Sequence, residues 1–469
     1  MTEAAPAWLR GRGYWLAVAA ILALAAVLRF YRLGEWSLWV DEGATYLRAS
    51  TGRLTDQGPM YSTAPLNFVV TGWVIRLMGA TPFWLRFFPA VCGIAGVGAL
   101  IWSGTLLASR GSGLIAGLLL AISPWHIEWS QNARHFSPAF LFMTVAFAAF
   151  FSFWESGKTW WLPLTALAAG LGLATHSSSA FALVAMGAYA GCLVLLPRFR
   201  GVVTRAKVVG TVATFAAIAL TYIPIALSVS SYLGEHKPAW NSPANVAESI
   251  AFYAGPLPLF LAGAVGLLES KAGRRGALLA LQWLAWPIAL AVLAATRTIS
   301  SNAYALVSLG GMVVLLGLGI ERLWTADAAS IRAMGTVLLI GLAAKFGSDT
   351  WLYYTKEQGN RPPWREATAW IAHHAAPNDS IFATEGIPVG YYLGNVSRGR
   401  WLDQWRPPGP GETQWLLVLE GRGALPESAL TTFLDRDCTL REVFYRNTGP
   451  KRRDIEAYRC GTAPKESGP

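Results

Sequence analysis

Residues 35–44 read Glu-Trp-Ser-Leu-Trp-Val-Asp-Glu-Gly-Ala and follow directly on the first long apolar segment of the chain. This stretch places two adjacent carboxylates, Asp41 and Glu42, where a hydrophobic helix is expected to leave a membrane. Ionisable groups near a bilayer are energetically costly and tend to be functional. The structural alternative is a solvated loop end that caps the following helix. The rest of the chain favours one of these two interpretations.

The composition is typical of a membrane protein. Of the 469 residues, 54% are hydrophobic and only 14% are charged, whereas soluble domains contain roughly 25% charged residues. The 22 tryptophans agree, because Trp and Tyr gather at membrane interfaces. The net charge of +11 does not indicate nucleic-acid binding, since the basic residues are scattered between apolar segments. We expect them in cytoplasmic loops and against the head groups of anionic membrane lipids.

Hydropathy predicts about eleven transmembrane helices. The first covers Tyr14–Leu28, and extends to Tyr31 if the side chain of Arg29 snorkels to the surface. Residues 34–82 are expected to form a mixed outer loop. Its apolar stretch Leu66–Met78 is too short for a span and is interpreted as an interfacial helix. The other ten spans are expected at 83–108, 113–123, 137–154, 160–175, 178–196, 208–229, 250–268, 277–295, 303–320 and 333–346.

The loop charges predict the orientation. With the N-terminus in the cytoplasm, eleven of the later loop cations fall on the cytoplasmic side, and three, Arg134, Lys237 and Arg297, fall on the opposite side. This positive-inside bias places Asp41 outside. The odd number of spans then places the C-terminus outside as well.

The composition changes after the last span, so that a transmembrane domain over 1–346 is followed by a polar domain over 347–462. Its predicted helices and strands lie at 364–375, 380–384, 414–419, 427–434, 441–445 and 455–458. Cys438 and Cys460 bracket the last strands and could pair in an oxidising compartment. Residues 463–469 are expected to form a disordered tail. The predicted fold class is an α-helical polytopic membrane protein with a small C-terminal extracytoplasmic α/β domain.

A second polar stretch, residues 123–138, lies on the same predicted outer side. Glu128, Gln131 and Arg134 are spaced three apart within it, so they share one face if the segment is helical. One interpretation is an ordinary polar loop with aromatic anchors. The other is that Arg134, with Gln131 and His135, binds a phosphate group.

Two isolated residues complete the phosphate-binding candidates. Arg297 lies near another outward helix end, and His176 could serve in the same way or be a structural residue. No nucleotide-binding signature such as G-x-x-x-x-G-K-[ST] is present, and no Cys/His cluster has the spacing of a zinc site. An enzyme on the outer face has no access to cytosolic nucleotides, but it can use an activated group carried by a lipid.

Four motifs lie in order along residues 14–200. They are Leu38-Trp39-Val40-Asp41-Glu42-Gly43, Ala64-Pro65-Leu66, Leu85-Arg86-Phe87-Phe88-Pro89-Ala90 and Ser130-Gln131-Asn132-Ala133-Arg134. Together they resemble the bacterial dolichyl-phosphate-mannose–protein mannosyltransferase-like family, which is related to the lipid A aminoarabinose transferase and belongs to the GT-C superfamily. The resemblance implies a GT-C-like fold in the bacterial cytoplasmic (inner) membrane. It also implies an inverting hexosyl- or pentosyltransferase that uses a polyprenyl-phosphate sugar donor at the extracytoplasmic face.

The same resemblance implies roles for individual residues. Asp41 matches the family's catalytic carboxylate and would accept the proton of the acceptor hydroxyl. Glu42 would orient the acceptor or the neighbours of Asp41, and a cation would meet the departing lipid phosphate. No cofactor is implied, and no obligatory divalent cation is expected, because a polyprenyl-phosphate leaving group needs no nucleotide-chelating metal. The acceptor is a lipid, a glycan or a protein hydroxyl.

The chain departs from the family in two places. Many members have His-Pro-Pro where this chain has Thr-Ala-Pro at 63–65, so any donor or metal role of that His is absent or displaced. Some relatives have a second Asp in the stretch that matches 134–139. Here Glu128 is the nearest acid and the possible second carboxylate, which leaves Asp41 as the main candidate.

Two other functions remain open. One is a transporter or flippase of lipid-linked envelope intermediates, with Asp41 and Arg134 as a gating or proton-coupled pair. Transporters place such groups near the bilayer midplane and often show inverted repeats, whereas here the acidic pair lies at the predicted membrane surface and no repeat is visible. The other is a catalytically inactive scaffold for envelope assembly.

Overall fold

The computed structural model describes residues 11–51, 65–233, 241–409, 411–420, 429–448 and 451–461. The chain divides into two compact units. Unit 1 comprises residues 1–31, 52–77 and 86–350, and unit 2 comprises 32–51, 78–85 and 351–469. The Asp41 stretch therefore folds together with the C-terminal domain, although nearly all of unit 1 separates them in the sequence.

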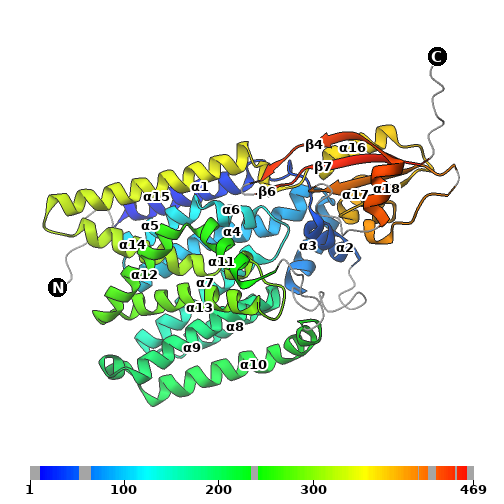
Figure 1. Ribbon diagram of the computed structural model, residues 1–469. Helices are drawn as coiled ribbons and strands as arrows, with labels where there is room; N and C mark the ends of the chain where they lie inside the picture. The colour runs from blue at the N-terminus through cyan, green and yellow to red at the C-terminus, as the bar shows by residue number, and fades with distance from the viewer. Residues whose placement is uncertain are drawn as a thin grey trace. The chain divides into compact units, whose positions relative to one another are not determined.

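Unit 1 is a bundle of α-helices whose long members lie side by side (Figure 1). The helices that fall in predicted spans are α1 (Arg12–Phe30), α4 (Pro82–Leu107), α5 (Arg110–Ala121), α7 (Phe136–Ser156), α8 (Trp161–Thr175), α9 (Ala180–Leu195), α10 (Arg205–Leu233), α11 (Pro243–Ala254), α12 (Pro256–Lys271), α13 (Arg275–Ala294), α14 (Ser308–Trp324) and α15 (Ala329–Thr355). The shorter elements are α3 (Pro65–Met78), α6 (Pro124–Ser130) and the 3-10 helices η3 (Ser177–Ser179), η4 (Pro197–Val202) and η5 (Asn302–Ala305).

The protein is a multi-pass membrane protein. Among the described residues, seven helices are long and apolar enough to cross a membrane, and one bent pair, α11 and α12, passes the same test together. Every predicted span is helical over most of its length, but the number eleven stays a prediction because α5 and α8 are shorter than a full span. The interfacial interpretation of α3 also stays a prediction.

The predicted span at 250–268 contains a sharp bend, so whether it crosses the membrane as one span stays a prediction. α11 and α12 meet at an angle of 87°. The break lies at Gly255, which has a φ of +81°, in the left-handed region that favours glycine. Pro256 follows and begins α12, where its missing N–H is no loss because the first turn has no partner for it.

The first span was expected to extend to Tyr31 if Arg29 snorkels, and Arg29 does not do so. The side chain of Arg29 is fully buried in unit 1. Its guanidinium donates to the backbone oxygens of Ala121 and Leu120, at 3.0 and 3.2 Å, and lies 2.7 Å from Nδ1 of His126. The guanidinium thus binds the last carbonyls of α5, where a cation is favourable because the helix dipole is negative there.

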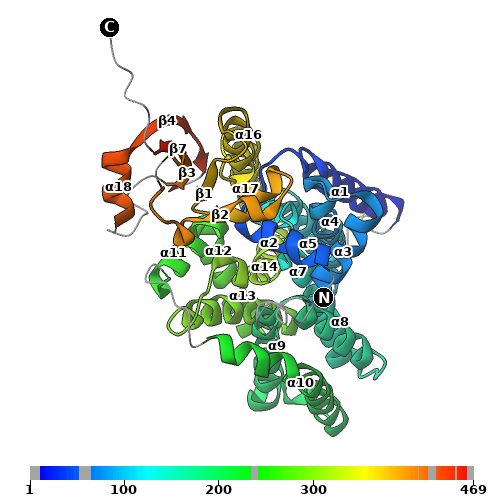
Figure 2. The same cartoon turned by 90° about the vertical axis from the view of Figure 1, so that its right-hand side faces the viewer.

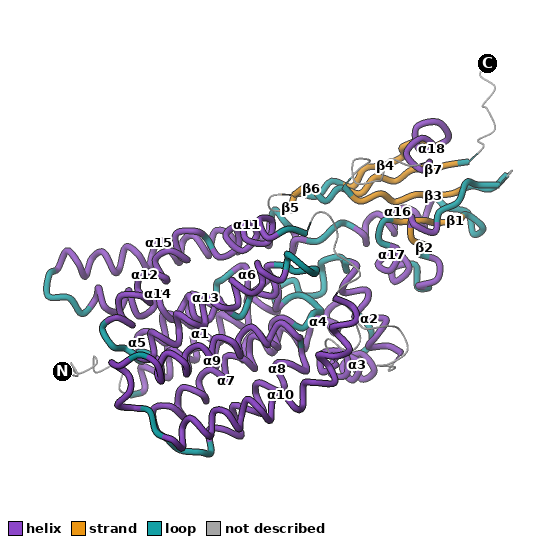
Figure 3. Tube along the Cα trace, turned by 60° about the horizontal axis from the view of Figure 1, so that its bottom comes forward, coloured by secondary structure: helices purple, strands orange, loops and turns teal. Residues whose placement is uncertain are grey.

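The central element of unit 2 is a five-stranded sheet in the order β2-β1-β3-β7-β4, drawn in orange in Figure 3. β1 is parallel to both of its neighbours, and β7 is antiparallel to both of its own. The strands are β1 (Ser380–Ala383), β2 (Arg400–Trp401), β3 (Gln414–Leu419), β4 (Cys438–Phe444) and β7 (Ile455–Cys460), with a separate pair formed by β5 (Asn447–Thr448) and β6 (Lys451–Arg452).

Helices cover both faces of this sheet (Figure 2). On one face α16 (Trp364–His374) and α17 (Gly386–Tyr392) pack through residues such as Trp364 and Val389. On the other face α18 (Ala429–Asp437) packs through Phe433 and Leu434. All six residues of β3 are buried because this strand is central and covered on both sides. The remaining elements are α2 (Val40–Thr51) and the 3-10 helices η6 (Gln358–Asn360), η7 (Val396–Arg398) and η8 (Leu402–Gln404).

The fold class predicted from the sequence is confirmed, and most C-terminal elements lie within a few residues of their predicted positions. The helix predicted at 427–434 is described from Ala429 onward, and the tail at 463–469 lies outside the described residues. α15 continues to Thr355, past the predicted domain boundary at 346. α17, β2 and the β5–β6 pair were not predicted. Cys438 and Cys460 are opposite each other in the β4–β7 register and form a disulfide.

Candidate active site

Asp41 lies in the first turn of α2, within unit 2. The preceding loop is held by Arg365 of α16, whose guanidinium donates to two backbone oxygens of that loop at 2.8 and 3.1 Å. The N–H of Leu38 donates to the hydroxyl of Tyr392 at 2.8 Å. Asp41 and Glu42 both lie where the positive end of the helix dipole favours a carboxylate.

Glu42 is fully buried and forms an ion pair with Arg361, with Nε and Oε2 3.4 Å apart. The guanidinium of Arg361 also lies over the ring of Trp39, 5.7 Å from its centroid. Removing one partner of a buried ion pair typically costs about 3–5 kcal/mol. This geometry favours Glu42 as a residue that fixes the start of α2, and therefore Asp41, over direct contact with an acceptor. A catalytic role for Glu42 stays a prediction.

A third carboxylate, which was not predicted, lies close enough to Asp41 to be affected by its charge. Glu385 follows the carboxyl end of β1 and accepts hydrogen bonds from Nε1 of Trp364, at 2.8 Å, and from the backbone N–H of Val40. Burial raises the pKa of Glu385 to about 7, and the negative charge of Asp41 adds to the rise. Glu385 therefore titrates near neutral pH, and it binds the first residue of α2, which immediately precedes Asp41.

The second polar stretch lies in unit 1, where α6 leads through a short turn into α7. The side-chain amide of Gln131 donates to the backbone oxygens of Leu28, Arg29 and Tyr31, at 3.3, 3.1 and 2.7 Å. Gln131 thus binds the C-terminal end of α1, since these are the carbonyls that an α-helix leaves without intrahelical partners. Phosphate binding by Gln131 stays a prediction, and this geometry favours a structural role.

Arg134, His135, His176 and Tyr304 lie together in unit 1, and we refer to them as the Arg134 cluster. The ring of His135 stacks on that of His176, with centroids 4.1 Å apart and an interplanar angle of 8°. The ring of His176 lies 4.9 Å from that of Tyr304. Burial lowers the pKa of His176 to about 3, and the charge of Arg134 adds to the decrease. At neutral pH His176 is uncharged, so the positive charge at this position comes from Arg134.

The protonation of His176 follows from its contacts. Its Nδ1 accepts a hydrogen bond from the backbone N–H of Ser178 at 3.1 Å. Because a neutral imidazole carries one proton, that proton lies on Nε2, which makes Nε2 a donor. The Arg134 cluster therefore combines one permanent cation with a neutral donor.

The other two predicted candidates are also in unit 1. Arg297 is exposed and lies in the turn after α13, in the same connection that carries Tyr304 of η5. Glu128 is buried in α6. The sequence had indicated Glu128 as the possible second acid. A catalytic role for Glu128 stays a prediction.

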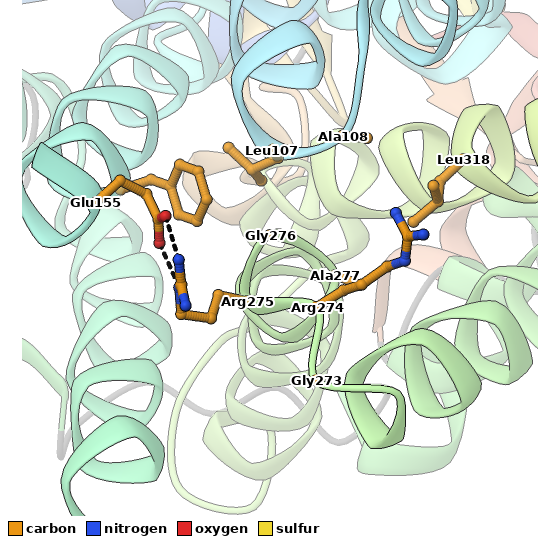
Figure 4. Close-up of a pocket in the computed structure, with 10 residues that line it drawn as sticks. Leu107, Ala108, Glu155, Gly273, Arg274, Arg275, Gly276, Ala277 and Leu318 are labelled. Atoms are coloured by element: carbon orange, nitrogen blue, oxygen red, sulfur yellow. Dashed lines mark hydrogen bonds and ion pairs between the residues drawn. The ribbon is translucent and has the colours of Figure 1, made fainter. Parts of the chain in front are cut away.

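A separate pocket of about 220 Å³ in unit 1 contains none of the predicted site residues (Figure 4). Glu155 and Arg275 face each other in it and form two hydrogen bonds, at 2.5 and 2.6 Å. Glu155 lies near the end of α7, and His135 immediately precedes that helix. At 1.5 Å per residue, α7 separates the two by about 30 Å. This pocket is therefore not part of the Arg134 cluster.

The part of the chain that the structure describes holds no group of three or more His, Cys, Asp or Glu side chains arranged to bind a metal ion. The expectation that no divalent cation is obligatory rests on the leaving group and stays a prediction.

Comparison with known proteins addresses the fold. The family model described as dolichyl-phosphate-mannose-protein mannosyltransferase matches residues 62–227. The crystal structure of ArnT from Cupriavidus metallidurans in the apo state is similar with a TM-score of 0.60 and 15% sequence identity, over 94% of this chain and 97% of that chain. The Archaeoglobus fulgidus oligosaccharyltransferase is similar with a TM-score of 0.59 and 14% identity, over 84% of this chain and 65% of that chain. No curated protein sequence matches this chain.

This chain has the GT-C glycosyltransferase fold. The resemblance inferred from the four motifs is confirmed at the level of the fold, and the family model supports it over residues 62–227. In this fold, the motif with Asp41 opens α2 and the motif with Arg134 forms the turn between α6 and α7.

Sequence reasoning missed Arg361, Glu385 and Tyr304. Glu385 had a signal: an acid that follows a buried strand and precedes a glycine lies at the carboxyl end of that strand, where functional groups of parallel sheets gather. No sequence pattern pointed to Arg361 or Tyr304, because the importance of each rests on a contact with a residue far away in the sequence.

Proposed function

We propose that this protein is an inverting glycosyltransferase that moves a sugar from a polyprenyl-phosphate-linked donor to an acceptor hydroxyl at the extracytoplasmic membrane face, with Asp41 as general base. The observation that carries the proposal is the fixed position of Asp41, at the start of α2 and beside a buried ion pair between Glu42 and Arg361. ArnT bound to undecaprenyl phosphate is similar over 98% of this chain, with a TM-score of 0.58 and 15% identity, which supports a lipid phosphate as the donor's carrier.

In the proposed reaction the acceptor oxygen attacks the anomeric carbon of the sugar. Asp41 takes the proton of the acceptor hydroxyl as the new carbon–oxygen bond forms. The bond between the anomeric carbon and the phosphate oxygen breaks, and the polyprenyl phosphate leaves with the bonding electrons. Attack opposite to the leaving group inverts the configuration. General-base assistance of this kind contributes about 10²–10⁴-fold in rate.

The Arg134 cluster is suited to the departing phosphate. Arg134 offers a planar set of N–H donors that matches phosphate oxygens, and His176 adds a neutral N–H donor from Nε2. Donors held in a water-poor environment stabilise negative charge as it develops on the leaving group. The lipid tail of the donor remains in the membrane, so the protein needs to recognise only the phosphate and the sugar.

A cell-free transfer assay tests the proposal. The purified full chain is incubated with a panel of radiolabelled polyprenyl-phosphate sugars and a membrane extract as acceptor, alongside Asp41→Asn and the control Asp403→Asn. Asp403 is an exposed acid of η8 in the same unit. We expect the unmodified protein and Asp403→Asn to transfer label, and Asp41→Asn to be inactive while folded.

Two outcomes would contradict the proposal. Transfer by a well-folded Asp41→Asn protein at the unmodified rate would remove Asp41 as the base. If no donor of the panel reacted, but a lipid-linked sugar crossed the bilayer of liposomes that contain the protein, the function would be that of a transporter or flippase.

A further inference from the structure

Unit 2 contains a polar pocket of about 230 Å³ that the proposed reaction does not use. Its charged lining consists of four arginines and two glutamates: Arg32, Arg361, Arg365, Arg446, Glu35 and Glu366. All of these come from the loop before α2, from the stretch between α15 and α16, from α16 itself, and from the turn after β4. The pocket is thus built from one unit of the chain.

The positive charges of the pocket exceed the carboxylates that pair with them. Arg32 pairs with Glu35, Arg446 pairs with Glu366, and Arg361 pairs with Glu42 behind the lining. Arg365 has no carboxylate among these pairs and instead donates to backbone oxygens of the loop before α2. One guanidinium is left without a matching negative charge in this group.

Two of the guanidinium groups also keep buried donors available. Among the residues that the structure describes, Nη2 of Arg361 and Nε of Arg446 are buried and have no hydrogen-bond partner. The side chain of Arg361 is only 3% exposed, and its bonds to Glu42 and to the backbone of Asn360 are both long, at 3.4 Å. Burial lowers the pKa of Arg446, and Glu366 opposes the decrease. Buried donors of this kind normally have a partner, and an anion in the pocket supplies acceptors for them.

The backbone around the pocket is held in an uncommon conformation. Of the four non-glycine residues with a φ in the left-handed region in the described ranges, three are here: Arg32 at 57°, Gln358 at 46° and Asn360 at 57°. Gly359 lies between the last two, and a Cβ at this position would lie 2.5 Å from the ring of Trp36. Such conformations persist only where the surrounding structure enforces them, and they gather at ligand sites.

The pocket is small and close in sequence to two membrane-length helices. Its volume is below the roughly 300–1,000 Å³ of sites for drug-sized ligands, so it suits a compact anion. Arg32 follows α1, which ends at Phe30, and Gln358 follows α15, which ends at Thr355. Arg32 and Gln358 thus lie within three residues of the ends of two helices that are long and apolar enough to cross a membrane, and the ends of such helices lie among lipid head groups.

We propose that this pocket binds a phosphate group and that the head group of an anionic membrane lipid supplies it. The guanidinium of arginine offers N–H donors that match phosphate oxygens better than the ammonium of lysine does, and Arg361 and Arg446 each have a buried donor without a partner among the described residues. The site is separate from the Arg134 cluster, and it does not depend on the proposed transferase activity. A lipid bound in this pocket would contact the segment before α2.

The test measures lipid binding to the full chain. The protein is delipidated in detergent and titrated with phosphatidylglycerol or with inorganic phosphate, and bound molecules are counted by native mass spectrometry. Arg446→Gln should weaken binding of phosphatidylglycerol about tenfold, as expected for the loss of one charged hydrogen-bonding partner. Glu366→Gln should strengthen binding, because it removes a competing carboxylate. The control Arg400→Gln, in β2 and outside the pocket, should have no effect.

The opposite effects of Arg446→Gln and Glu366→Gln separate binding from damage to the fold, since misfolding would weaken binding in both variants. If inorganic phosphate binds with this same pattern and phosphatidylglycerol does not, the phosphate site stands and the lipid source is rejected. If neither ligand responds to Arg446→Gln, the proposal is overturned.

Discussion

The two candidate sites of this protein differ in how their charges are arranged. In the Arg134 cluster of unit 1, the cation Arg134 lies with His176, which burial keeps uncharged at neutral pH, and with the ring of Tyr304. Near Asp41 in unit 2, Glu42 pairs with Arg361, and burial raises the pKa of Glu385 to about 7. The first arrangement suits the stabilisation of a single developing negative charge, and the second suits the control of a proton. This difference predicts that substitutions in the two units will change different kinetic constants.

The largest effect is expected for Asp41→Asn. Loss of the base should lower kcat by about 10²–10⁴-fold, with little change in KM for the donor, because the side chain acts on the acceptor proton during the chemical step. Steady-state transfer kinetics at saturating acceptor measure this. A raised donor KM with an unchanged kcat would assign Asp41 to donor binding. It would contradict the assignment of proton transfer to the Asp41 site and phosphate binding to the Arg134 cluster.

Arg134→Gln should weaken binding of the donor rather than lower kcat. Removing a charged hydrogen-bond donor from a buried phosphate site costs on the order of 1.5–3 kcal/mol, or about 10–150-fold in donor affinity. The measurement is direct binding of a radiolabelled polyprenyl-phosphate sugar, which does not require turnover. The control is Arg205→Gln, an exposed cation at the start of α10. Unchanged donor binding in Arg134→Gln would move the phosphate site to Arg297.

Glu385→Gln should change the pH dependence of stability. Burial raises the pKa of Glu385 from 4.5 to about 7, so the folded state favours the neutral acid. Its contribution to stability is fully present below about pH 4.5 and is lost as the pH rises toward 7. The loss is on the order of 3 kcal/mol, from 1.36 kcal/mol per unit of pKa.

Thermal unfolding of the full chain between pH 4.5 and 8, followed by tryptophan fluorescence, measures this effect. The unmodified protein should lose stability across the interval, and Glu385→Gln should lose less, since glutamine remains neutral and can still accept from Trp364. The control Glu442→Gln replaces an exposed carboxylate of β4 and should keep the slope of the unmodified protein. Equal slopes in Glu385→Gln and the unmodified protein would contradict the assignment.

The smallest effect is expected from removal of divalent cations. We expect EDTA to leave the transfer rate unchanged, because the leaving group carries a single phosphate that Arg134 can meet. Transfer in chelated and in magnesium- or manganese-supplemented buffer provides the measurement. A rate that falls with EDTA and returns with one cation would show that the Arg134 cluster is not sufficient for the leaving group.

Local patterns predicted the helices and most strands, and they also selected the two stretches that carry the candidate site residues. Hydropathy located every long helix because each apolar run is long enough to act alone, and the spacing of Cys438 and Cys460 around strands indicated their pairing. The turn with Arg134 could be read because its residues are neighbours in the chain. These features depend on short-range information.

The features that the sequence did not reveal depend on contacts made at a distance. Snorkelling was considered for Arg29, but its guanidinium binds the backbone oxygens at the end of α5. The break at Gly255 lies inside an apolar run, which hydropathy treats as continuous. Glu385 and Arg361 are of interest because they contact the α2 segment, and no periodicity in the sequence predicts those contacts.

The ion pair between Glu42 and Arg361 joins residues 319 positions apart, and this separation has a consequence for biosynthesis. At about 5–20 residues per second, the ribosome needs roughly 15–60 s after Glu42 to reach Arg361. During this interval the segment with Asp41 has left the ribosome and the helices of unit 1 are being made, while α16 and the sheet do not yet exist. The nascent protein therefore reaches the membrane with its proposed base unassembled, and it becomes competent only near the end of translation.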